Sequence, residues 1–236
     1  VSDGNPFDNT LARLIALIYE DDVGVVDITE PSYPKQCYVI WDNYADDGFG
    51  VGLSSQLDLV YPFNSQLADD FQFTSMMGVL SVHWWGVFWN GGGYPNPCEF
   101  NVIFYADDGS GNMPTGAGMD NPTSTALAVY NFPAVTGISY GTDKYEYDVT
   151  IDPVFVADAD QKYWVAIQAV FPYSTAGQWG WSTNGNNPDQ MHESMQGFPL
   201  LGYPYWIDPG YGDAAFQLGG YYYWPEHLFP GTYPVT

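Results

Sequence analysis

The sequence predicts an all-β protein, a jelly-roll-like sandwich of two antiparallel sheets, for three reasons. Short runs such as "KYEYDVTI" and "CEFNVIFY" alternate apolar and polar residues, as strands with one buried face do. Gly, Pro, Asn and Asp separate these runs at short intervals, which is typical of turns. No helical repeat of apolar residues recurs between the runs, so a parallel α/β sheet is not expected. The length of 236 residues suits one large all-β domain with flanking segments.

The N-terminal extension, residues 1–36, differs in pattern from the rest of the chain. In "DNTLARLIALIY", Asp8 or Asn9 can cap a helix whose apolar residues follow at helical spacing. The later stretch "DVGVVDITE" predicts an extended segment that could serve as an arm between subunits. Its apolar side chains are those of Val23, Val25, Val26 and Ile28.

The sandwich itself is expected over residues 37–220, followed by an aromatic, proline-containing tail at 221–236. "KYWVAIQAVF" is continuously apolar, which favours a central strand buried on both faces. The tail has no strand repeat of useful length and would be an exposed apolar patch if left free in water. We expect strands near residues 37–42, 51–60, 67–74, 77–89, 98–105, 125–131, 144–151, 161–170, 177–182 and 213–218.

Charge and hydropathy exclude two classes of partner. Four Lys and Arg residues stand against 28 Asp and Glu, which gives a formal net charge of -24. Nucleic acid binding needs a basic surface, and an anionic membrane would repel this chain. The longest strongly apolar run, Leu14 to Tyr19, is too short to cross a bilayer, so no membrane insertion is expected. The chain begins at Val1 without an initiator Met, which fits a secreted or cell-surface protein that has lost a signal peptide.

The two cysteines, Cys37 and Cys98, both lie in strand-like surroundings. In an exported protein they predict a disulfide, which would close a loop of about 60 residues and stabilise the fold by roughly 4 kcal/mol. The alternative is a pair of buried free thiols.

Two copies of "YADDG", at 44–48 and 105–109, are candidate calcium loops. Adjacent carboxylates repel one another, and a shared hard cation relieves the repulsion. The second copy continues as "DDGSGN" and is the better candidate, although the spacing is not that of an EF-hand. The alternative is that Asp-Gly pairs simply form turns. The expected ligands are Asp46, Asp47, Asp107, Asp108 and Asn112.

The stretch "VHWWGVFWNGGG" at 82–93 raises the question of whether its rings are displayed or buried. Side chains alternate across a strand, so Trp84 and Trp85 face opposite sides. In "WGW", Trp179 and Trp181 share one face. We expect half of these rings in the core and half available for contact, where they could stack on sugar rings.

Enzyme signatures fail when their context is considered. "GISYG" matches the nucleophile-elbow formula around Ser139, but a strand pattern follows where that motif needs a helix. "HESMQ" has Gln196 in place of the second zinc-binding histidine. The three histidines are far apart in the chain, and no spacing singles out a glycosidase pair among the 28 carboxylates. We therefore expect no catalysis.

The order and spacing of "ADDF", "VHWWG", "FNVIFYADDG", "PTG", "YWVAIQA", "WGW" and "DAAFQLGG" resemble an uncharacterised β-sandwich family of secreted and surface-anchored bacterial proteins. The resemblance covers about residues 37–220 and implies an extracellular location without catalysis. It leaves out both flanking segments. The residues that carry it are Asp69, Asp70, Trp84, Trp85, Phe104, Tyr105, Trp164 and Trp181.

The leading hypothesis is an exported structural protein whose copies assemble into a filament or surface layer. A flanking segment would add as a strand to the open sheet edge of a neighbouring copy. The first choice for this segment is "DVGVVDITE", and the second is the C-terminal tail. Cations bridging the Asp loops would offset repulsion between copies. The alternative is a carbohydrate-binding module that uses Trp84, Trp85, Trp179 and Trp181 on a polysaccharide, and a hydrolase with scattered carboxylates is a weaker third.

Overall fold

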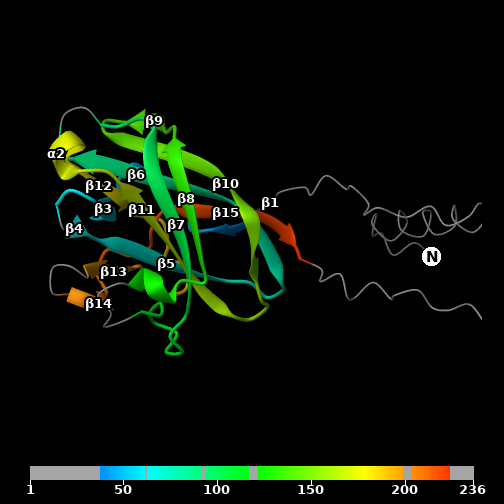
Figure 1. Cartoon of the computed structure of the whole chain (residues 1–236). Helices are drawn as coiled ribbons and strands as arrows, with labels where there is room; N and C mark the ends of the chain where they lie inside the picture. The colour runs from blue at the N-terminus through cyan, green and yellow to red at the C-terminus, as the bar shows by residue number, and fades with distance from the viewer. Residues whose placement is uncertain (1–37, 62, 92–93, 117–121, 199–202, 224–236) are drawn as a thin grey trace, which may run out of the picture. The chain divides into compact units, whose positions relative to one another are not determined.

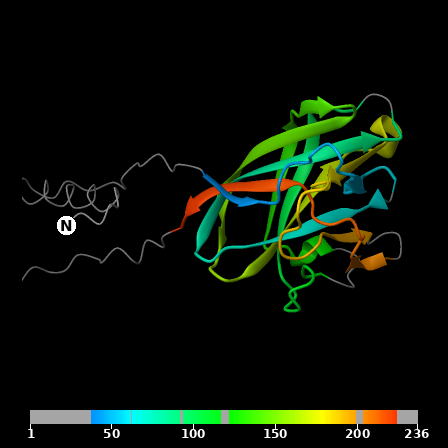
Figure 2. The same ribbon diagram turned by 180° about the vertical axis from the view of Figure 1, so that it is seen from behind.

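The computed structural model describes residues 38–61, 63–91, 94–116, 122–198 and 203–223, and these form a two-sheet β-sandwich (Figures 1 and 2). All of them belong to the larger of the chain's two units, Gln36–Thr236. The predicted fold class is confirmed. The predicted N-terminal helix and the arm residues Val23, Val25, Val26 and Ile28 lie outside the described residues.

The first sheet has β6 at its centre, with one long strand on one side and two collinear strands on the other. β10 pairs with β6 from Met77 to Val87, whereas β15 and β12 pair with its two halves. All pairs in this sheet are antiparallel. Its strands are β1 (Tyr38–Asp42), β2 (Gly52–Ser54), β6 (Met77–Trp89), β9 (Ile138–Gly141), β10 (Lys144–Ala157), β12 (Gln178–Ser182) and β15 (Phe216–Tyr222).

The second sheet is built around β11, which β7 flanks on one side and β5 and β3 on the other. Every pair is antiparallel except β3 with β11. Its strands are β3 (Gln56–Asp58), β4 (Phe63–Asn64), β5 (Gln66–Gln72), β7 (Cys98–Ala106), β8 (Ala128–Val135), β11 (Lys162–Val170), β13 (Met195–Phe198) and β14 (Tyr203–Ile207).

Most predicted strands are present, and the bounds predicted for 77–89 are those of β6. The single strand predicted at 51–60 is wrong, because β2 pairs with β12 in the first sheet and β3 pairs with β11 in the second. The chain changes sheet at Ser55, whose buried hydroxyl donates to the carbonyl of Ile167. The sequence pattern also missed β4, β9, β13 and β14, and it ended β15 four residues before Tyr222.

The main core fills the space between the sheets. Where β6 pairs with β12, tryptophan side chains of each strand pack against a glycine of the other. Residues 86–89 of β6 pair with residues 178–181 of β12. A Cβ atom on Gly86 would lie 2.4 Å from the ring of Trp179, and one on Gly180 would lie 2.7 Å from the ring of Trp89. Each strand therefore provides a glycine that leaves room for a tryptophan of the other, and the two interlock.

The chain enters and leaves the described domain at one end. Tyr38, at the start of β1, is paired with Gly220, and Tyr222, at the end of β15, is paired with Met77. The opposite end of β6, Trp89, is paired with Gln178 of β12 (Figure 1). The helices are the four-residue α2 (Tyr173–Ala176) and the 3-10 turn η1 (Pro122–Thr125). Within the described ranges, no helix is long and apolar enough to span a lipid bilayer.

Candidate functional site

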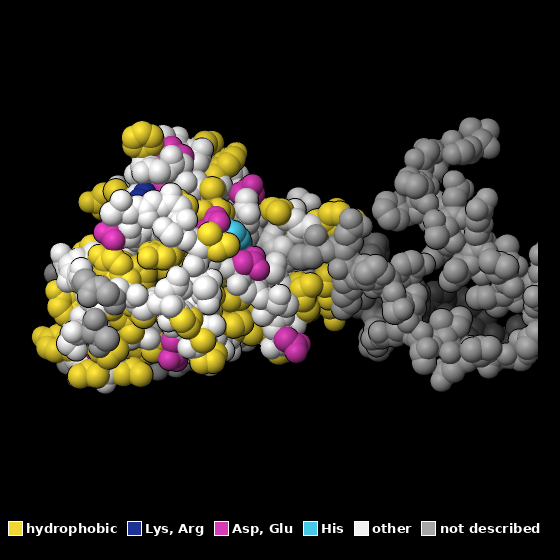
Figure 3. All heavy atoms as spheres, turned by 90° about the horizontal axis from the view of Figure 1, so that it is seen from above, with side chains coloured by type: hydrophobic (Ala, Val, Ile, Leu, Met, Phe, Trp, Pro, Cys, Tyr) yellow, Lys and Arg dark blue, Asp and Glu magenta, His cyan; other side chains and the backbone are white. Residues whose placement is uncertain are grey.

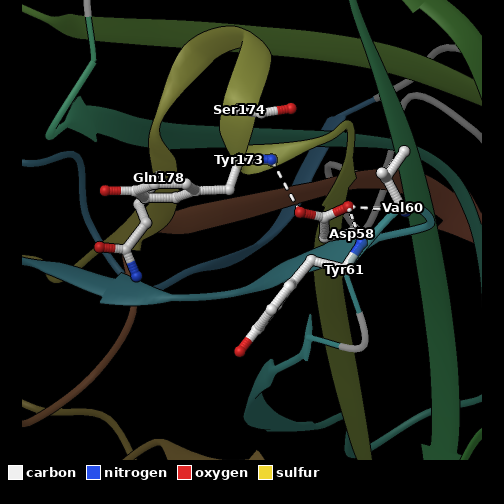
Figure 4. A pocket seen from close by; sticks show the side chains of 6 residues that line it. All are labelled: Asp58, Val60, Tyr61, Tyr173, Ser174 and Gln178. Carbon is white, nitrogen blue, oxygen red and sulfur yellow. Dashed lines mark hydrogen bonds between the residues drawn. The ribbon is translucent and has the colours of Figure 1, made fainter.

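A groove of about 510 Å³ lies beside α2, β3 and β4, at the end of the sandwich remote from the entry and exit of the chain (Figure 1), and Figure 4 shows its lining side chains. The loop between β3 and β4 forms one wall, and α2 with the start of β12 forms the other. We call it the tyrosine groove. It is lined by Asp58, Val60, Tyr61, Tyr173, Ser174 and Gln178.

Asp58 holds the two walls of the tyrosine groove together. Its Oδ1 accepts from the backbone N–H groups of Val60 at 2.7 Å and Tyr61 at 2.9 Å, and its Oδ2 accepts from the N–H of Tyr173 at 2.8 Å (Figure 4). Burial raises the pKa of Asp58, but these three hydrogen bonds outweigh it and the pKa lies below its ordinary value. The carboxylate is thus ionised at neutral pH, and both oxygens are already used.

Two glutamines add further support behind the groove. The buried amide of Gln56 donates to the carbonyl of Phe171 at 3.1 Å and accepts from the N–H of Trp179 at 2.8 Å, which ties β3 to both ends of the α2 segment. Gln178 accepts from the indole N–H of Trp89 at 2.8 Å through its Oε1. The walls are therefore preorganised by hydrogen bonds from three strands.

The exposed surface of the groove is mainly aromatic and apolar, because the one charged side chain that lines it, Asp58, is buried. The side chains of Tyr61 and Tyr173 are 66% and 48% exposed, and the neighbouring Leu59 and Val60 are exposed by three quarters. Figure 3 shows hydrophobic side chains gathered at this end of the domain, with acidic ones scattered singly over the face in view. A surface of this kind suits an uncharged apolar or aromatic partner.

A second groove, of about 540 Å³, runs where the edges of the two sheets diverge. β8 pairs only with β7 among the described strands, so its other edge has no strand partner there. The hydroxyl of Tyr130 on β8 donates to the carbonyl of Pro153 on β10 at 2.8 Å and links the sheets across the gap. We call this the edge groove, and it is lined by Ala128, Val129, Tyr130, Asn131, Phe132, Thr150, Asp152 and Pro153.

The two "YADDG" loops share one hydrogen-bond pattern. Oδ1 of Asp46 accepts from the N–H groups of Gly48 and Gly50, both at 2.8 Å. Oδ1 of Asp107 does the same with the glycines two and four residues later, also at 2.8 Å. The first aspartate of each copy thus folds its own loop, as an Asp-Gly turn does.

The cation that contacts each loop is a lysine. Nζ of Lys144 lies 2.7 Å from Oδ2 of Asp46 and 3.1 Å from the carbonyl oxygens of Gly48 and Gly50. Nζ of Lys162 lies 2.8 Å from the carbonyl oxygen of Gly111, the corresponding position in the second loop. Burial raises the pKa of Asp46, but hydrogen bonds from Lys144, Tyr140 and Ser182 bring it below its ordinary value.

The described residues contain no group of three or more His, Cys, Asp or Glu side chains placed to hold a metal ion. Of the five predicted ligands, Asp46 contacts Lys144, Asp47 accepts from the N–H of Phe49, and Asp107 accepts from the indole of Trp164 at 3.1 Å. Asp108 accepts from the N–H of Ser110 at 2.8 Å. The backbone N–H of the remaining one, Asn112, donates to the hydroxyl oxygen of Ser110 at 3.1 Å. Calcium binding stays a prediction.

The expectation that half of the tryptophan rings are available for contact is wrong. Trp84, Trp179 and Trp181 are fully buried in the core between the sheets, and Trp85, on the opposite face of β6, is only 7% exposed. Trp84 packs on Phe100 with ring centroids 5.1 Å apart. The face of β6 that carries Trp85 is partly exposed at His83, Val87 and Trp89, but the four predicted rings themselves offer little surface for a sugar.

Cys98 is a free, buried cysteine. Burial raises the pKa of its thiol to about 12, so it stays protonated and unreactive at neutral pH. Cys37 lies outside the described residues, and the disulfide has no support in the structure.

A buried pair of carboxyl groups lies where the sheets meet near β1 and β15. Asp69 of β5 accepts from the N–H of Ala214 at 2.5 Å and from Asn43 at 3.2 Å, so it ties the second sheet to segments of the first. Burial, with the charges of Asp213 and Asp70, raises its pKa well above the ordinary value. Burial also raises the pKa of Asp213 to about 7. Oδ1 of Asp213 has no hydrogen-bond partner within the part of the chain that the structure describes.

Sequence reasoning missed the tyrosine groove because residues 51–60 had the pattern of one strand. The signal of a turn was present in "DLVYP". Its aspartate can accept from the N–H groups two and three residues later, and a proline follows them. Tyr173 and Ser174 had no signal of their own, since only the sheet pairing brings α2 beside the β3–β4 loop.

Comparison with curated proteins gives no match. Comparison with protein families matches residues 39–218 to a domain of unknown function, DUF7901. That range covers every strand of the sandwich except the ends of β1 and β15, so the relationship predicted from sequence motifs is confirmed as one to an uncharacterised family. The chain belongs to the DUF7901 domain family.

Proposed function

We propose that this chain is an extracellular structural protein whose copies assemble into a filament or surface layer by strand addition. The observation that carries the proposal is the edge of β8 beside the edge groove, which has no strand partner among the described residues. An unpaired strand edge presents backbone N–H and C=O groups that pair readily with another extended chain. The proposal assigns the chain no catalytic activity.

The strand that we assign to this edge is the "DVGVVDITE" segment of a neighbouring copy. Its alternating side chains, including those of Val26 and Ile28, would enter the edge groove while its backbone pairs with β8. The segment joins the sandwich through β1, whose start is paired with Gly220. The carbohydrate-binding alternative loses its basis, because the four tryptophans on which it depended are buried.

The test uses a charge placed on β8. Val129 is 42% exposed on this strand, and Val129→Lys would put an ammonium group beside the added strand. Ile138→Lys is the matched control: it makes the same charge change at a 66% exposed position on β9, a different sheet edge. Negative-stain microscopy and sedimentation should give polymers for the wild type and the control and shorter or no polymers for Val129→Lys.

The arm is tested in the same way. Val26→Lys should weaken assembly, whereas Thr29→Lys, on the alternate side of an extended segment, should have less effect. A wild-type protein that remains a monodisperse monomer at all concentrations contradicts the proposal. Polymers that are indifferent to Val129→Lys place the contact elsewhere and contradict strand addition at β8.

A further inference from the structure

We propose that the tyrosine groove of one copy binds residues 224–236 of the next copy, so that copies join head to tail. The inference rests on the proposed self-assembly and names a second contact for it. Three arguments support it: the chemistry of the groove, the composition of the segment, and the distance between the groove and the point where the segment begins.

The groove has the chemistry of sites that bind proline-containing peptides. Such sites offer aromatic faces on which proline rings pack, together with a few polar groups that bind backbone carbonyls. Tyr61 and Tyr173 are the exposed rings, and the amide nitrogen of Gln178 has no hydrogen-bond partner among the described residues. Both oxygens of Asp58 are occupied by backbone N–H groups, so the groove makes no demand for a cation.

The segment "WPEHLFPGTYPVT" has a matching composition. Its thirteen residues include three prolines and three aromatic residues, and it contains no Lys or Arg. A chain of net charge -24 cannot easily approach itself through acidic surfaces, so a contact between copies is favoured where the two sides carry few acidic residues. Glu226 is the only acidic residue of this segment. Proline also lowers the conformational entropy lost on binding.

The distance from the end of β15 to the tyrosine groove indicates that the groove of one copy binds the segment of another copy. β6 spans the sandwich from Met77, paired with Tyr222, to Trp89, paired with Gln178 of the groove. Its 13 residues cover about 40 Å at the rise of a β-strand. Residues 224–236, even fully extended, reach about 45 Å from Tyr223. Reaching the groove of their own domain would use up nearly all of them, with only about one or two residues left to fill it.

The two ends of the domain are therefore complementary and different. The exit of β15 lies at one end of the sandwich and α2 with the β3–β4 loop at the other (Figures 1 and 2). When a contact joins two different surfaces, a pair of copies still has one unused surface of each kind. Repetition of the contact therefore generates an open chain of subunits. This contact would give the proposed filament a direction.

The first experiment titrates a fluorescently labelled synthetic peptide of residues 224–236 into the full chain below the concentration at which it polymerises. We expect saturable binding with a Kd on the order of 10–100 µM. Tyr61→Ala and Tyr173→Ala should each weaken binding roughly tenfold, as loss of an aromatic anchor does. Tyr211→Ala, at a 59% exposed position outside the groove, should bind as the wild type does.

Two results of this titration would overturn the inference. One is the absence of saturable binding to the wild type, or equal binding to all three tyrosine variants. The other is binding of a neutral oligosaccharide that Tyr61→Ala abolishes while peptide binding persists, which would assign the groove to a sugar. Thermal unfolding of each variant verifies that the fold is intact.

The second experiment separates this inference from the proposed function. Excess peptide should shorten wild-type polymers, a scrambled peptide should not, and Tyr61→Ala should raise the protein concentration needed for assembly. If the wild type polymerises and these treatments have no effect, the head-to-tail contact is contradicted and self-assembly stands. If the wild type never polymerises, self-assembly is contradicted, and the peptide titration alone decides whether the groove binds this segment.

Discussion

Lys144 and Lys162 are the two basic residues of the described domain, and each contacts an Asp-Gly loop rather than the solvent. Their side chains are only 18% and 16% exposed, and their carboxylate partners, Asp46 and Asp70, are fully buried at the side chain. Removing one partner of such a pair leaves the other charge buried and unpaired, which is strongly destabilising. The few cations in this acidic chain thus serve the fold.

The buried carboxyl of Asp213 predicts a pH-dependent stability. Its pKa in the folded protein is about 7, against 3.8 for an unperturbed aspartate, because burial disfavours the charged form. The folded state therefore holds the proton more tightly, and the contribution of Asp213 to stability falls as pH rises from about 4 to about 7. Above that range the full cost of burying the charge is present.

Asp213→Asn removes this cost. We expect the variant to unfold roughly 3–6 °C above the wild type at pH 8, with a smaller difference at pH 5, where the folded carboxyl is already protonated. Thermal unfolding followed by circular dichroism at both pH values measures it. Asp158→Asn, at an exposed position, is the control and should leave the transition unchanged. A difference that is the same at pH 5 and pH 8 would show that the carboxyl does not titrate as described.

At the scale of elements, the pairing of β6 with β12 joins two segments that are distant in sequence through closely packed glycines and tryptophans. Gly86→Ala would place a methyl group 2.4 Å from the Trp179 ring, and both belong to paired strands that cannot separate without losing hydrogen bonds. Overpacking of this kind costs about 1–3 kcal/mol.

We therefore expect Gly86→Ala to lower the unfolding temperature by roughly 4–10 °C. Gly141→Ala is the matched control, since its Cβ would meet only the side chain of Lys144 at 3.6 Å or more, an ordinary contact. Differential scanning calorimetry compares the two. Similar unfolding temperatures for both variants would mean that Trp179 moves away at little cost.

Strand pattern predicted most of the elements but not their partners. The alternation in β7 and β10 and the continuous apolar run of β11 were sufficient to locate those strands. Residues 51–60 carried no sign that Ser55 divides them between two sheets, because that division is set by pairing with β12 and β11. The tyrosine groove depends on the same division, so the sequence predicted neither. Burial of Trp85 likewise depends on covering side chains that no local pattern specifies.

At the scale of the whole molecule, the proposed self-assembly would have to overcome repulsion between copies that each carry a formal charge of -24. Salt screens such repulsion, and the screening length falls from about 30 Å at 10 mM to about 3 Å at 1 M. We predict that the protein concentration needed for polymerisation falls as NaCl rises from 10 to 500 mM, as measured by sedimentation. Assembly that weakens with salt would indicate that attraction between opposite charges holds the copies together.

The same experiment with calcium chloride at constant ionic strength separates screening from binding. An effect of calcium beyond that of NaCl, lost in Asp107→Asn and Asp108→Asn, would assign the cation to the second Asp-Gly loop. An equal effect of the two salts would contradict the calcium prediction.

The pairing of Tyr38 with Gly220 has a mechanical consequence. β1 and β15 are adjacent and antiparallel, and both flanking segments attach at the same end of this pair, so tension between the two flanks would peel the strands apart one hydrogen bond at a time. Tension that enters at the tyrosine groove and leaves through the end of β15 would instead pull β6 and β15 past each other. All backbone hydrogen bonds between these two strands would then share the force at once. A fibre joined in that manner would resist stretching far better than the isolated domain pulled by its ends.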